Sequence, residues 1–383
     1  MSANEVTPFR IEIPQSELDD LRRRLEAARW PAEIEETRRA DGITTEAMRS
    51  LVDRWLHGFD WRSQEAGLNR FPQVVTEVDG QRLHAVHRPS PRADAEPLVL
   101  LHGWPSTFAE FRRVIDELAE PADGPAFHVI APSLPGYGFS GPVRERGWGA
   151  HRIARAVAEL VHRLGYDRYL AHGGDAGYQV AAALARVDRE RVAGIHLNLG
   201  GVGLAGLHRD EPPADDVEEL ALRRYADYVR DKSAYALLNA TRPQTVAYAL
   251  ADSPAGQLAW IAEKFLDWAD PAHPVPADDV LTTASIYWFT RTAASSARFY
   301  QEEYTANRAP GTGPTLERTY VEVPTAVAVF PGEIVPPVRR WAQERYHIVR
   351  WTELPAGGHF SALERPDLML SALRGFAAAL SPA

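Results

Sequence analysis

Short apolar runs alternate with longer helical patterns along most of the chain from about residue 96 onward. Apolar runs of this length, without polar interruption, are typical of strands buried on both faces, as in a parallel sheet with helical crossovers. The pattern therefore predicts an α/β fold with a mostly parallel sheet. The predicted strands cover residues 98–101, 127–130, 169–171, 192–199, 326–330 and 348–351.

Two segments depart from this rhythm and divide the chain into four predicted parts. Residues 1–90 begin with a polar helix that Pro31 ends, and they continue into a strand at 74–78 that enters a turn at Asp79-Gly80. Residues 207–317 are mostly helical, with the clearest helices at 223–238 and 285–304. We predict an amino-terminal extension (1–90), a core in two parts (91–206 and 318–383) and a helical cap inserted between them (207–317). The first helix is predicted from four apolar residues at helical spacing, Leu18, Leu21, Leu25 and Ala28.

Composition narrows the possible classes of function. The 383 residues carry a net charge of −10, so no basic excess exists to neutralise nucleic-acid phosphates. The absence of cysteine excludes disulfides, thiolate metal sites and thiol catalysis. The first residues show no basic segment followed by an apolar core, and no stretch approaches the ~20 apolar residues that span a bilayer. We expect a soluble, cytoplasmic protein with no nucleic-acid or membrane partner.

The chemistry begins at residues 173–177, which read Gly-Gly-Asp-Ala-Gly between a predicted strand and a helix at 178–187. This is the G-x-S-x-G nucleophile elbow of α/β hydrolases with Asp175 in place of serine. The elbow holds its nucleophile on a strained turn above the sheet, and small residues on both sides let strand and helix pack closely. The alternative is a glycine-rich turn in which Asp175 only caps the helix.

An aspartate at the elbow changes the reaction. A carboxylate, with an ordinary pKa of ~3.9, needs no base before it attacks. It displaces a leaving group from saturated carbon and forms an alkyl ester. The substrate is therefore expected to be an epoxide or a halide, and a serine esterase is excluded at the elbow itself.

Hydrolases of this fold place an acid and then a histidine after the nucleophile. Glu333 follows the predicted strand at 326–330, and His359 follows the last predicted strand and precedes the final helix. His359, oriented by Glu333, would activate the water that hydrolyses the ester. The alternatives are a structural histidine and a surface carboxylate, with the catalytic acid placed after an earlier strand.

The tetrahedral intermediate of ester hydrolysis needs hydrogen-bond donors. The backbone N–H groups of Trp104 and Ala176 are the predicted donors, because this fold builds its oxyanion hole after the first core strand and directly after the nucleophile. We interpret His102, in the same loop as Trp104, as a residue that organises the loop.

These motifs together resemble microsomal-type epoxide hydrolases over nearly the whole chain. The resemblance is carried by the elbow, by Gly-Gly-His-Phe at 357–360, by Pro8-Phe9-Arg10-Ile11 and Trp30-Pro31 in the extension, by His102-Gly103-Trp104-Pro105, and by residues 132–140. It extends into the cap through 252–256 and Glu263-Lys264-Phe265. The family uses Glu or Asp at the acid position, which is consistent with Glu333. Its membrane-bound members carry an amino-terminal anchor that this sequence does not show.

The resemblance also implies two cap tyrosines that activate the epoxide oxygen, and their motif positions fall on Tyr235 and Tyr300. A phenol can hydrogen-bond to that oxygen and protonate it as the C–O bond breaks. The resemblance implies a small-molecule epoxide as substrate, and a homodimer would suit it. We expect neither a cofactor nor a metal. Two roles are open for a bacterial member: natural-product biosynthesis, for example of an antibiotic in an enediyne pathway, and xenobiotic degradation.

Two other functional classes remain. A haloalkane or haloacid dehalogenase shares the Asp–His–acid design, but many such enzymes place Trp where this chain has Ala176. A non-catalytic binding protein of this fold would have lost the nucleophile or the histidine, and both are present. Four aromatic residues of the cap either line an apolar substrate pocket or pack between cap helices: Trp260, Trp268, Trp288 and Phe289.

Overall fold

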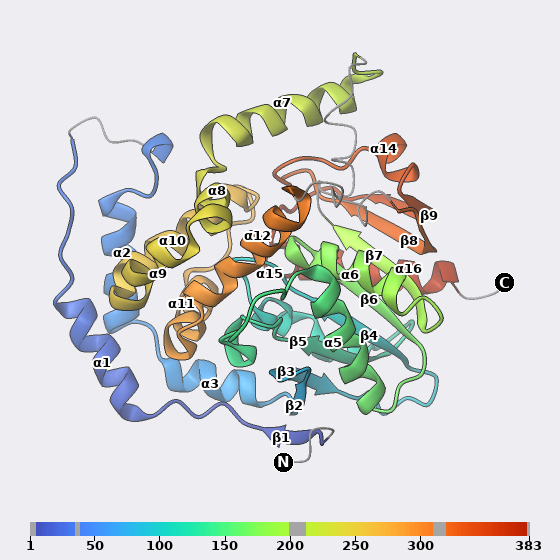
Figure 1. Cartoon of the computed structure of the whole chain (residues 1–383), viewed down its shortest axis with the longest axis horizontal. Coiled ribbons are helices and arrows are strands. Elements are labelled where there is room, and N and C mark those ends of the chain that lie inside the picture. Colours follow the sequence, from blue (N-terminus) through green and yellow to red (C-terminus); the bar gives the residue numbers. More distant parts are fainter. Residues whose placement is uncertain (1–4, 35–38, 199–211, 309–318, 381–383) are drawn as a thin grey trace.

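A central twisted sheet organises the computed structural model, which describes residues 5–34, 39–198, 212–308 and 319–380 (Figure 1). Within this part of the chain the sheet has nine strands in the order β1-β2-β3-β5-β4-β6-β7-β8-β9. All pairs from β5 to β9 are parallel, and the pairs β1–β2, β2–β3 and β3–β5 are antiparallel. The strands are β1 (Thr7–Phe9), β2 (Gln73–Val78), β3 (Gln81–Arg88), β4 (Glu96–Leu101), β5 (Phe127–Pro132), β6 (Tyr169–Gly174), β7 (Val192–Asn198), β8 (Val321–Val329) and β9 (Tyr346–Glu353).

Helices cover both faces of the parallel strands, which explains their continuous apolar runs. In β4, Val99 and Leu101 belong to the cluster that packs under α5 and α6, whereas Leu98 and Leu100 belong to the cluster under α4 and α16. Alternate residues of a strand point to opposite faces, so both faces are buried. The six predicted core strands and the α/β class are confirmed. The core helices are η2 (Phe108–Arg113), α4 (Ile115–Ala119), η3 (Gly138–Ser140), α5 (Ala150–Arg163), α6 (Ala176–Val187), α14 (Arg339–Gln343), α15 (Ser361–Glu364) and α16 (Pro366–Leu380).

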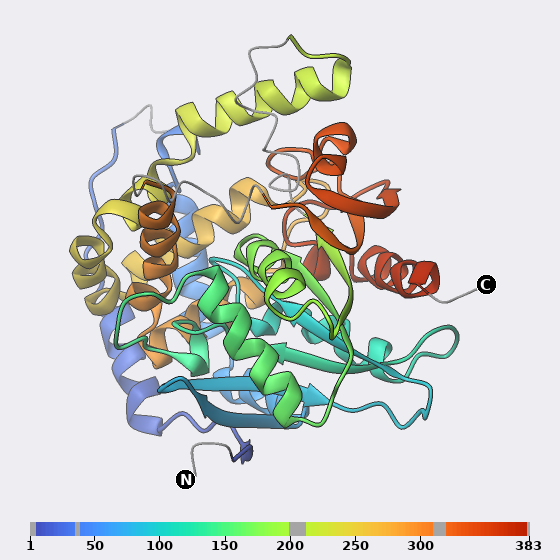
Figure 2. The same ribbon diagram turned by 45° about the vertical axis from the view of Figure 1, so that its right-hand side comes forward.

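The extension both wraps the core and adds strands to it. The predicted strand at 74–78 is confirmed as part of β2, and the predicted turn at Asp79-Gly80 joins β2 to β3. Strand β3 pairs with β5 and so extends the sheet on that side. The predicted first helix ends at Glu26, before Pro31. Figure 2 shows the extension along one side of the cap. Its helices are α1 (Gln15–Glu26), η1 (Arg39–Asp41), α2 (Thr45–His57) and α3 (Trp61–Asn69).

The cap consists of helices stacked at the carboxyl edge of the sheet, and here two sequence predictions were wrong. The predicted helix at 223–238 is two helices that separate at Lys232 and Ser233. The predicted helix at 285–304 is also two, because Arg291 adopts a left-handed conformation (φ 55°). The cap helices are α7 (Asp216–Asp231), α8 (Ala234–Thr241), α9 (Pro243–Asp252), α10 (Pro254–Trp268), α11 (Ala277–Thr290) and α12 (Ala293–Arg308).

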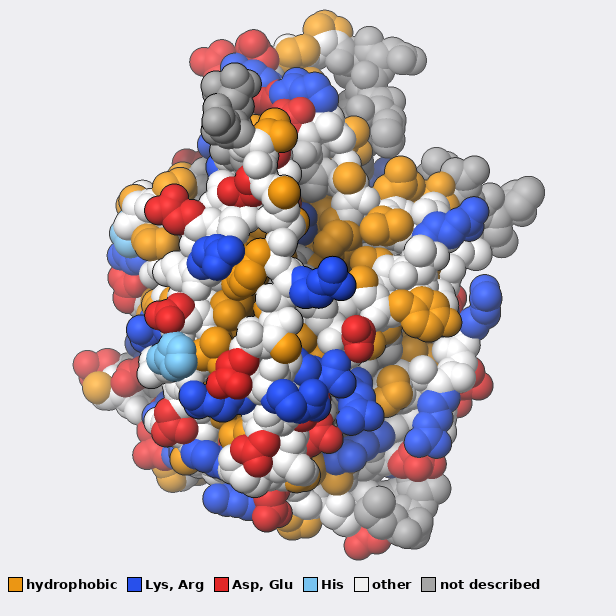
Figure 3. Space-filling view, turned by 90° about the vertical axis from the view of Figure 1, so that its left-hand side faces the viewer, with side chains coloured by type: hydrophobic (Ala, Val, Ile, Leu, Met, Phe, Trp, Pro, Cys, Tyr) orange, Lys and Arg blue, Asp and Glu red, His pale blue; other side chains and the backbone are white. Residues whose placement is uncertain are grey.

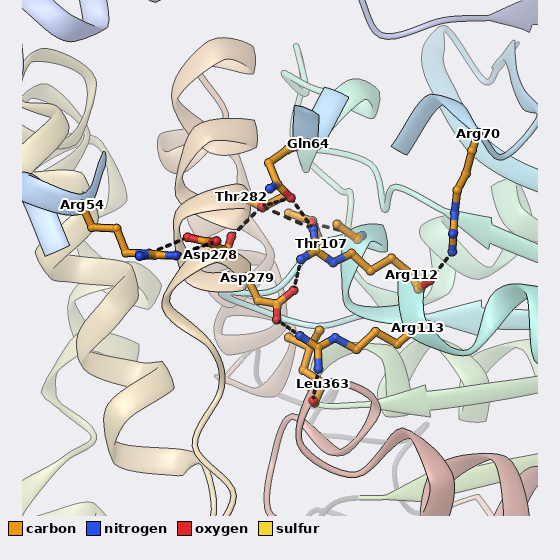
Figure 4. A network of polar contacts seen from close by, with 11 residues as sticks. Arg54, Gln64, Arg70, Thr107, Arg112, Arg113, Asp278, Asp279, Thr282 and Leu363 are labelled. Atoms are coloured by element: carbon orange, nitrogen blue, oxygen red, sulfur yellow. Dashed lines mark hydrogen bonds and ion pairs between the residues drawn. The ribbon is translucent and has the colours of Figure 1, made fainter. Parts of the chain in front are cut away.

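Ion pairs join the extension, the core and the cap at the start of α11 (Figure 4). Arg54 of α2 forms two hydrogen bonds of 2.7 and 2.8 Å with the carboxylate of Asp278. The buried carboxylate of the next residue, Asp279, pairs with Arg112 and Arg113 of the core. The three parts are therefore tied together beside the site described below. Figure 3 shows the face that carries much of the extension, where basic and acidic side chains are interspersed.

Several sequence predictions lie outside the described residues: the start of the chain, Leu199, and the cap boundaries at 206/207 and 317/318. Among the described helices, none combines the length and the apolar character that crossing a bilayer requires.

Candidate active site

The elbow at Asp175 has the strained geometry that its sequence predicts. Asp175 joins β6 to α6 with φ 48° and ψ −132°, a conformation that non-glycine residues rarely adopt. A Cβ at Gly173 would clash with the backbone of Gly177, and a Cβ at Gly177 would clash with the backbone of Leu101. The two glycines therefore permit the close approach of strand and helix that lifts Asp175 above the carboxyl edge of the sheet.

The predicted oxyanion donors both point at one oxygen of Asp175. The backbone N–H of Trp104 donates to Asp175 Oδ1 at 2.8 Å, and that of Ala176 donates to the same atom at 2.7 Å. Asp175 Oδ2 is left to face His359 and the space above the elbow. The side chain also caps α6, so the capping alternative and the elbow coexist.

His359 and Glu333 come from adjacent loops at the same edge of the sheet. These loops follow β9 and β8, and a bridge between Gly332 and Gly358 holds them side by side. Glu333 Oε1 lies 2.8 Å from His359 Nδ1, and His359 Nε2 lies 3.5 Å from Asp175 Oδ2. Both side chains are almost fully buried. The structure thus brings together the three residues that the sequence selected from distant segments.

Two carboxylates control the charge of His359. Burial acts to lower the pKa of its imidazole, but Glu333 and Asp175 together overcome this effect and raise that pKa well above the ordinary value. The imidazole is therefore held in its charged form while both carboxylates are negative. Neutralising one carboxylate would remove part of the stabilisation and favour the neutral imidazole.

Aromatic side chains of the core and the cap meet above the elbow. The ring of Trp104 stacks on Tyr235, with centroids 5.0 Å apart, and meets Tyr300 edge-on at 5.9 Å. The two tyrosine rings lie 5.9 Å apart. Trp268 contacts both Tyr235 and His359. The cap thus places both predicted tyrosines next to the residue whose N–H holds Asp175.

The two phenols remain protonated in this environment. Burial, followed by the neighbouring tyrosines and Asp175, raises the pKa of Tyr300 well above its usual value of 10. Burial, Tyr228 and Asp175 do the same for the pKa of Tyr235. Each hydroxyl can therefore donate a hydrogen bond to a ligand oxygen.

The aromatic residues predicted as pocket candidates fall into two groups. Trp260 and Trp268 join the cluster around Trp104. By contrast, Arg24 lies over the ring of Trp288, and Phe289 packs 5.0 Å from Trp61 of the extension. These contacts favour the packing alternative for Trp288 and Phe289.

His102 organises its loop, as interpreted from the sequence. Its Nε2 accepts a hydrogen bond from the backbone N–H of Leu134 at 3.1 Å, and its Nδ1 donates to the carbonyl oxygen of Gly103 at 3.0 Å. Burial lowers the pKa of His102 to about 4, so the ring is neutral near pH 7. The side chain fixes the segment that carries the Trp104 N–H.

Sequence reasoning missed three polar residues next to this site. The Tyr228 hydroxyl lies 2.9 Å from that of Tyr235. The buried ammonium of Lys264 lies 4.3 Å from the centroid of the Tyr235 ring. Glu110 lines the small cavity beside Asp175 and His359. Of these three, only Lys264 could have been found from the sequence, because it falls in a motif shared with the family. Nothing in the spacing of Tyr228 or Glu110 along the chain indicates that they lie near the site.

The described residues contain no group of three or more His, Asp or Glu side chains that could hold a metal ion. The comparisons agree with the geometry in pointing to one family. Residues 6–111 match the family model described as epoxide hydrolase N terminus, and residues 96–366 match that of the alpha/beta hydrolase fold. A protein of Stigmatella aurantiaca that carries an epoxide hydrolase name is 43% identical over 96% of this chain and 84% of its own length. The chain belongs to the epoxide hydrolase family of α/β hydrolases.

Two further relatives extend this likeness to the whole epoxide hydrolase architecture. Epoxide hydrolase 1 of Sus scrofa is 32% identical, over 97% of this chain and 88% of its own. The solved structure of Aspergillus niger epoxide hydrolase is 34% identical and superposes with a TM-score of 0.86 over 98% of this chain and 97% of that one. These matches extend over the extension, the core and the cap, so the likeness to epoxide hydrolases is not confined to the hydrolase core.

Proposed function

We propose that this enzyme converts an epoxide into a vicinal diol through an ester on Asp175. The observation that carries the proposal is the arrangement of the Asp175 carboxylate. Its Oδ1 is held by two backbone N–H groups, and its Oδ2 faces His359, itself paired with Glu333. Such a carboxylate is suited to attack carbon with Oδ2, while its carbonyl carbon stays prepared for a second, hydrolytic step.

In the first step Asp175 Oδ2 attacks one epoxide carbon and the C–O bond to the epoxide oxygen breaks. Tyr235 and Tyr300 hydrogen-bond to that oxygen and supply its proton. Their raised pKa values support this role, since both phenols hold their protons near neutral pH. Their position in the cap, opposite the core-borne Asp175, suits backside displacement.

In the second step water adds to the Asp175 carbonyl carbon, with His359 as base. Ester formation removes the negative charge of Asp175, which lowers the pKa of His359 and favours the neutral imidazole that can accept a proton. The Trp104 and Ala176 N–H groups stabilise the negative charge on Oδ1. When the intermediate collapses, the bond from the carbonyl carbon to Oδ2 breaks and Oδ2 leaves with the diol.

The surroundings of the site favour an apolar epoxide. Trp104, Trp260 and Trp268 form an aromatic cluster beside the two tyrosines, and such surfaces bind apolar or aromatic substituents. The test is a panel of terminal, aryl and bulky epoxides together with haloalkanes of matched size, assayed for diol by chiral chromatography and for released halide. Diol from at least one epoxide is the expected result. Faster halide release than diol formation would identify a dehalogenase instead.

The biological role is a separate question from the chemistry. An antibiotic-biosynthetic role stays a prediction, which the substrate panel would test. A cytoplasmic location and a homodimer also stay predictions, which cell fractionation and sedimentation, respectively, would test.

A further inference from the structure

A small cavity lies beside the Asp175 carboxylate and the His359 imidazole. Its volume is ≈ 10 Å³, close to the ~10–15 Å³ that one water molecule needs. Its polar lining includes Ser106, Glu110 and His172 in addition to Asp175 and His359. The size and polarity of this cavity fit a single ordered water.

One hydroxyl in the lining lacks the partner that buried polar atoms normally have, and a carboxyl group beside it has a raised pKa. Ser106 is 2% exposed, and its Oγ forms no hydrogen bond of good geometry with any described residue. Burial raises the pKa of Glu110 to about 7, although the nearby Ser106 hydroxyl and His359 act to lower it. A buried polar group without a partner costs free energy unless a water satisfies it.

We propose that this cavity holds the hydrolytic water, with Glu110 and Ser106 as its positioning residues. The inference rests on the Asp175 ester of the proposed function. Water has two protons to donate and two lone pairs. It would donate one proton to His359 Nε2 and one hydrogen bond to the Glu110 carboxylate, and it would accept a hydrogen bond from Ser106. The remaining lone pair is then free to attack the Asp175 carbonyl carbon.

The step balances without any further reactant. The water oxygen bonds to the Asp175 carbonyl carbon, and its proton passes to His359 Nε2. Collapse then breaks the bond from that carbon to the alkyl oxygen, which leaves with the proton from His359 as the diol hydroxyl. The second proton of the water leaves Asp175 for solvent, and the phenol that gave its proton in the first step takes one up, so Asp175 regains a carboxylate in which one oxygen came from water. Glu110 changes neither bonding nor charge in this cycle, because it only holds the water.

The cavity wall is fixed by the same contacts that join core and cap. Glu110 belongs to η2, whose Arg112 and Arg113 pair with Asp279 of α11 (Figure 4). The Tyr287 hydroxyl, also from α11, donates to the carbonyl oxygen of Ser106 at 3.1 Å. A rigid wall of this kind is what a water-positioning site requires, since small displacements of a reacting group slow its reaction strongly.

Several titratable groups surround Glu110. Asp175 and His359 face it across the cavity, and Glu364 of α15 lies within electrostatic range. His172 of β6 also lines the cavity, and burial lowers the pKa of its imidazole to about 3, so it stays neutral. If replacing Glu110 changes the pH dependence of ester hydrolysis, the change therefore reports the titration of Glu110 itself.

The test separates the two chemical steps by rapid quench and intact-protein mass spectrometry of a single turnover. Glu110→Gln keeps the size of the side chain, and Ser106→Val fills the cavity with methyl groups. Both variants should form the ester at the wild-type rate and hydrolyse it about 10–100-fold more slowly. In Glu110→Gln the hydrolysis rate should also change less steeply with pH between about 6 and 8. Glu65→Gln is the matched control, because Glu65 is a buried carboxylate of the extension that hydrogen-bonds to Ile13 N and Trp61 Nε1.

Each outcome decides a different claim. Ester hydrolysis at the wild-type rate in both variants overturns the water site and leaves the ester mechanism intact. Equal slowing of ester formation and hydrolysis also overturns it, because the residues would then act on the fold. A wild-type enzyme that makes diol without any ester overturns the proposed function, and the water site with it.

Discussion

His359 Nε2 lies 3.5 Å from Asp175 Oδ2, on the ring edge opposite the one that contacts Glu333. One imidazole therefore links the carboxylate that would carry the ester to the carboxylate that would orient the base. This relationship gives each member of the trio a separate step, so their variants should differ in which step they stop.

Replacing His359 with glutamine should trap the ester. Asp175 needs no base to attack, so alkylation should continue, whereas ester hydrolysis should slow by about 10²–10⁴-fold without its base. Intact-protein mass spectrometry after mixing with an epoxide should show a persistent adduct of substrate mass. Asp175→Ala is the control and should show none. If His359→Gln fails to form the adduct, the imidazole acts before the ester, and the division of labour is wrong.

The tyrosine pair should be needed for the first step alone. Tyr235→Phe and Tyr300→Phe should each slow ester formation and keep some activity, because one phenol remains. The double variant leaves no proton donor for the epoxide oxygen, and general acid catalysis is typically worth ~10²–10⁴-fold. The pre-steady-state rate of ester formation measures this effect. A double variant that opens epoxides at the wild-type rate would contradict the assignment.

Gly103 should tolerate no side chain. An added Cβ would overlap Asp175 Cβ and Oδ1, so Gly103→Ala must displace either the nucleophile or the loop that carries the Trp104 N–H. We expect kcat to fall by about 10²-fold or more, since even small misplacements have such effects. Gly67→Ala is the matched control, because a Cβ there meets nothing within 4 Å. It lies in α3 and should raise stability by up to about 1 kcal/mol. Full activity in Gly103→Ala would show that the elbow has more room than the structure gives it.

Replacing the buried His84 should lower the free energy of unfolding by an amount that depends on pH. Burial lowers the pKa of its imidazole to about 3, from an ordinary 6.5. The folded state therefore binds fewer protons than the unfolded state below pH 6.5, and the contribution of His84 to stability is lost as the pH falls through this range. His84→Gln should consequently cost about 1.4 kcal/mol less at pH 5.5 than at pH 7.5. Urea denaturation at the two pH values measures the difference, and an equal cost at both would indicate a normal pKa.

Structure could be predicted best where only certain residue types can occupy a given position in the fold. The apolar runs required strands buried on both faces, and the glycines around Asp175 required a close approach of strand and helix; both features are present. Helix ends without such signals could not be predicted. Neither Lys232-Ser233 nor Arg291-Thr292 contains the glycine or proline that usually marks a break, and tertiary packing decides both.

The site shows the same division. Asp175, Glu333 and His359 could be chosen because chain order and local glycines restrict where a nucleophile, an acid and a base occur in this fold. Tyr235 and Tyr300 could be chosen only through a resemblance, since nothing in their spacing separates them from other tyrosines. Glu110 and Ser106 gave no signal, because their proximity to His359 arises from the folding of η2 against a distant loop.

The most direct test of the whole account is a single turnover in ¹⁸O-labelled water, with enzyme in excess of the epoxide. If Oδ2 of Asp175 becomes the new hydroxyl oxygen of the diol, the diol should be almost entirely unlabelled. One ¹⁸O atom should then be found in the peptide that contains Asp175. Incorporation of ¹⁸O directly into the diol in that first turnover, with no label in the peptide, would contradict the covalent mechanism.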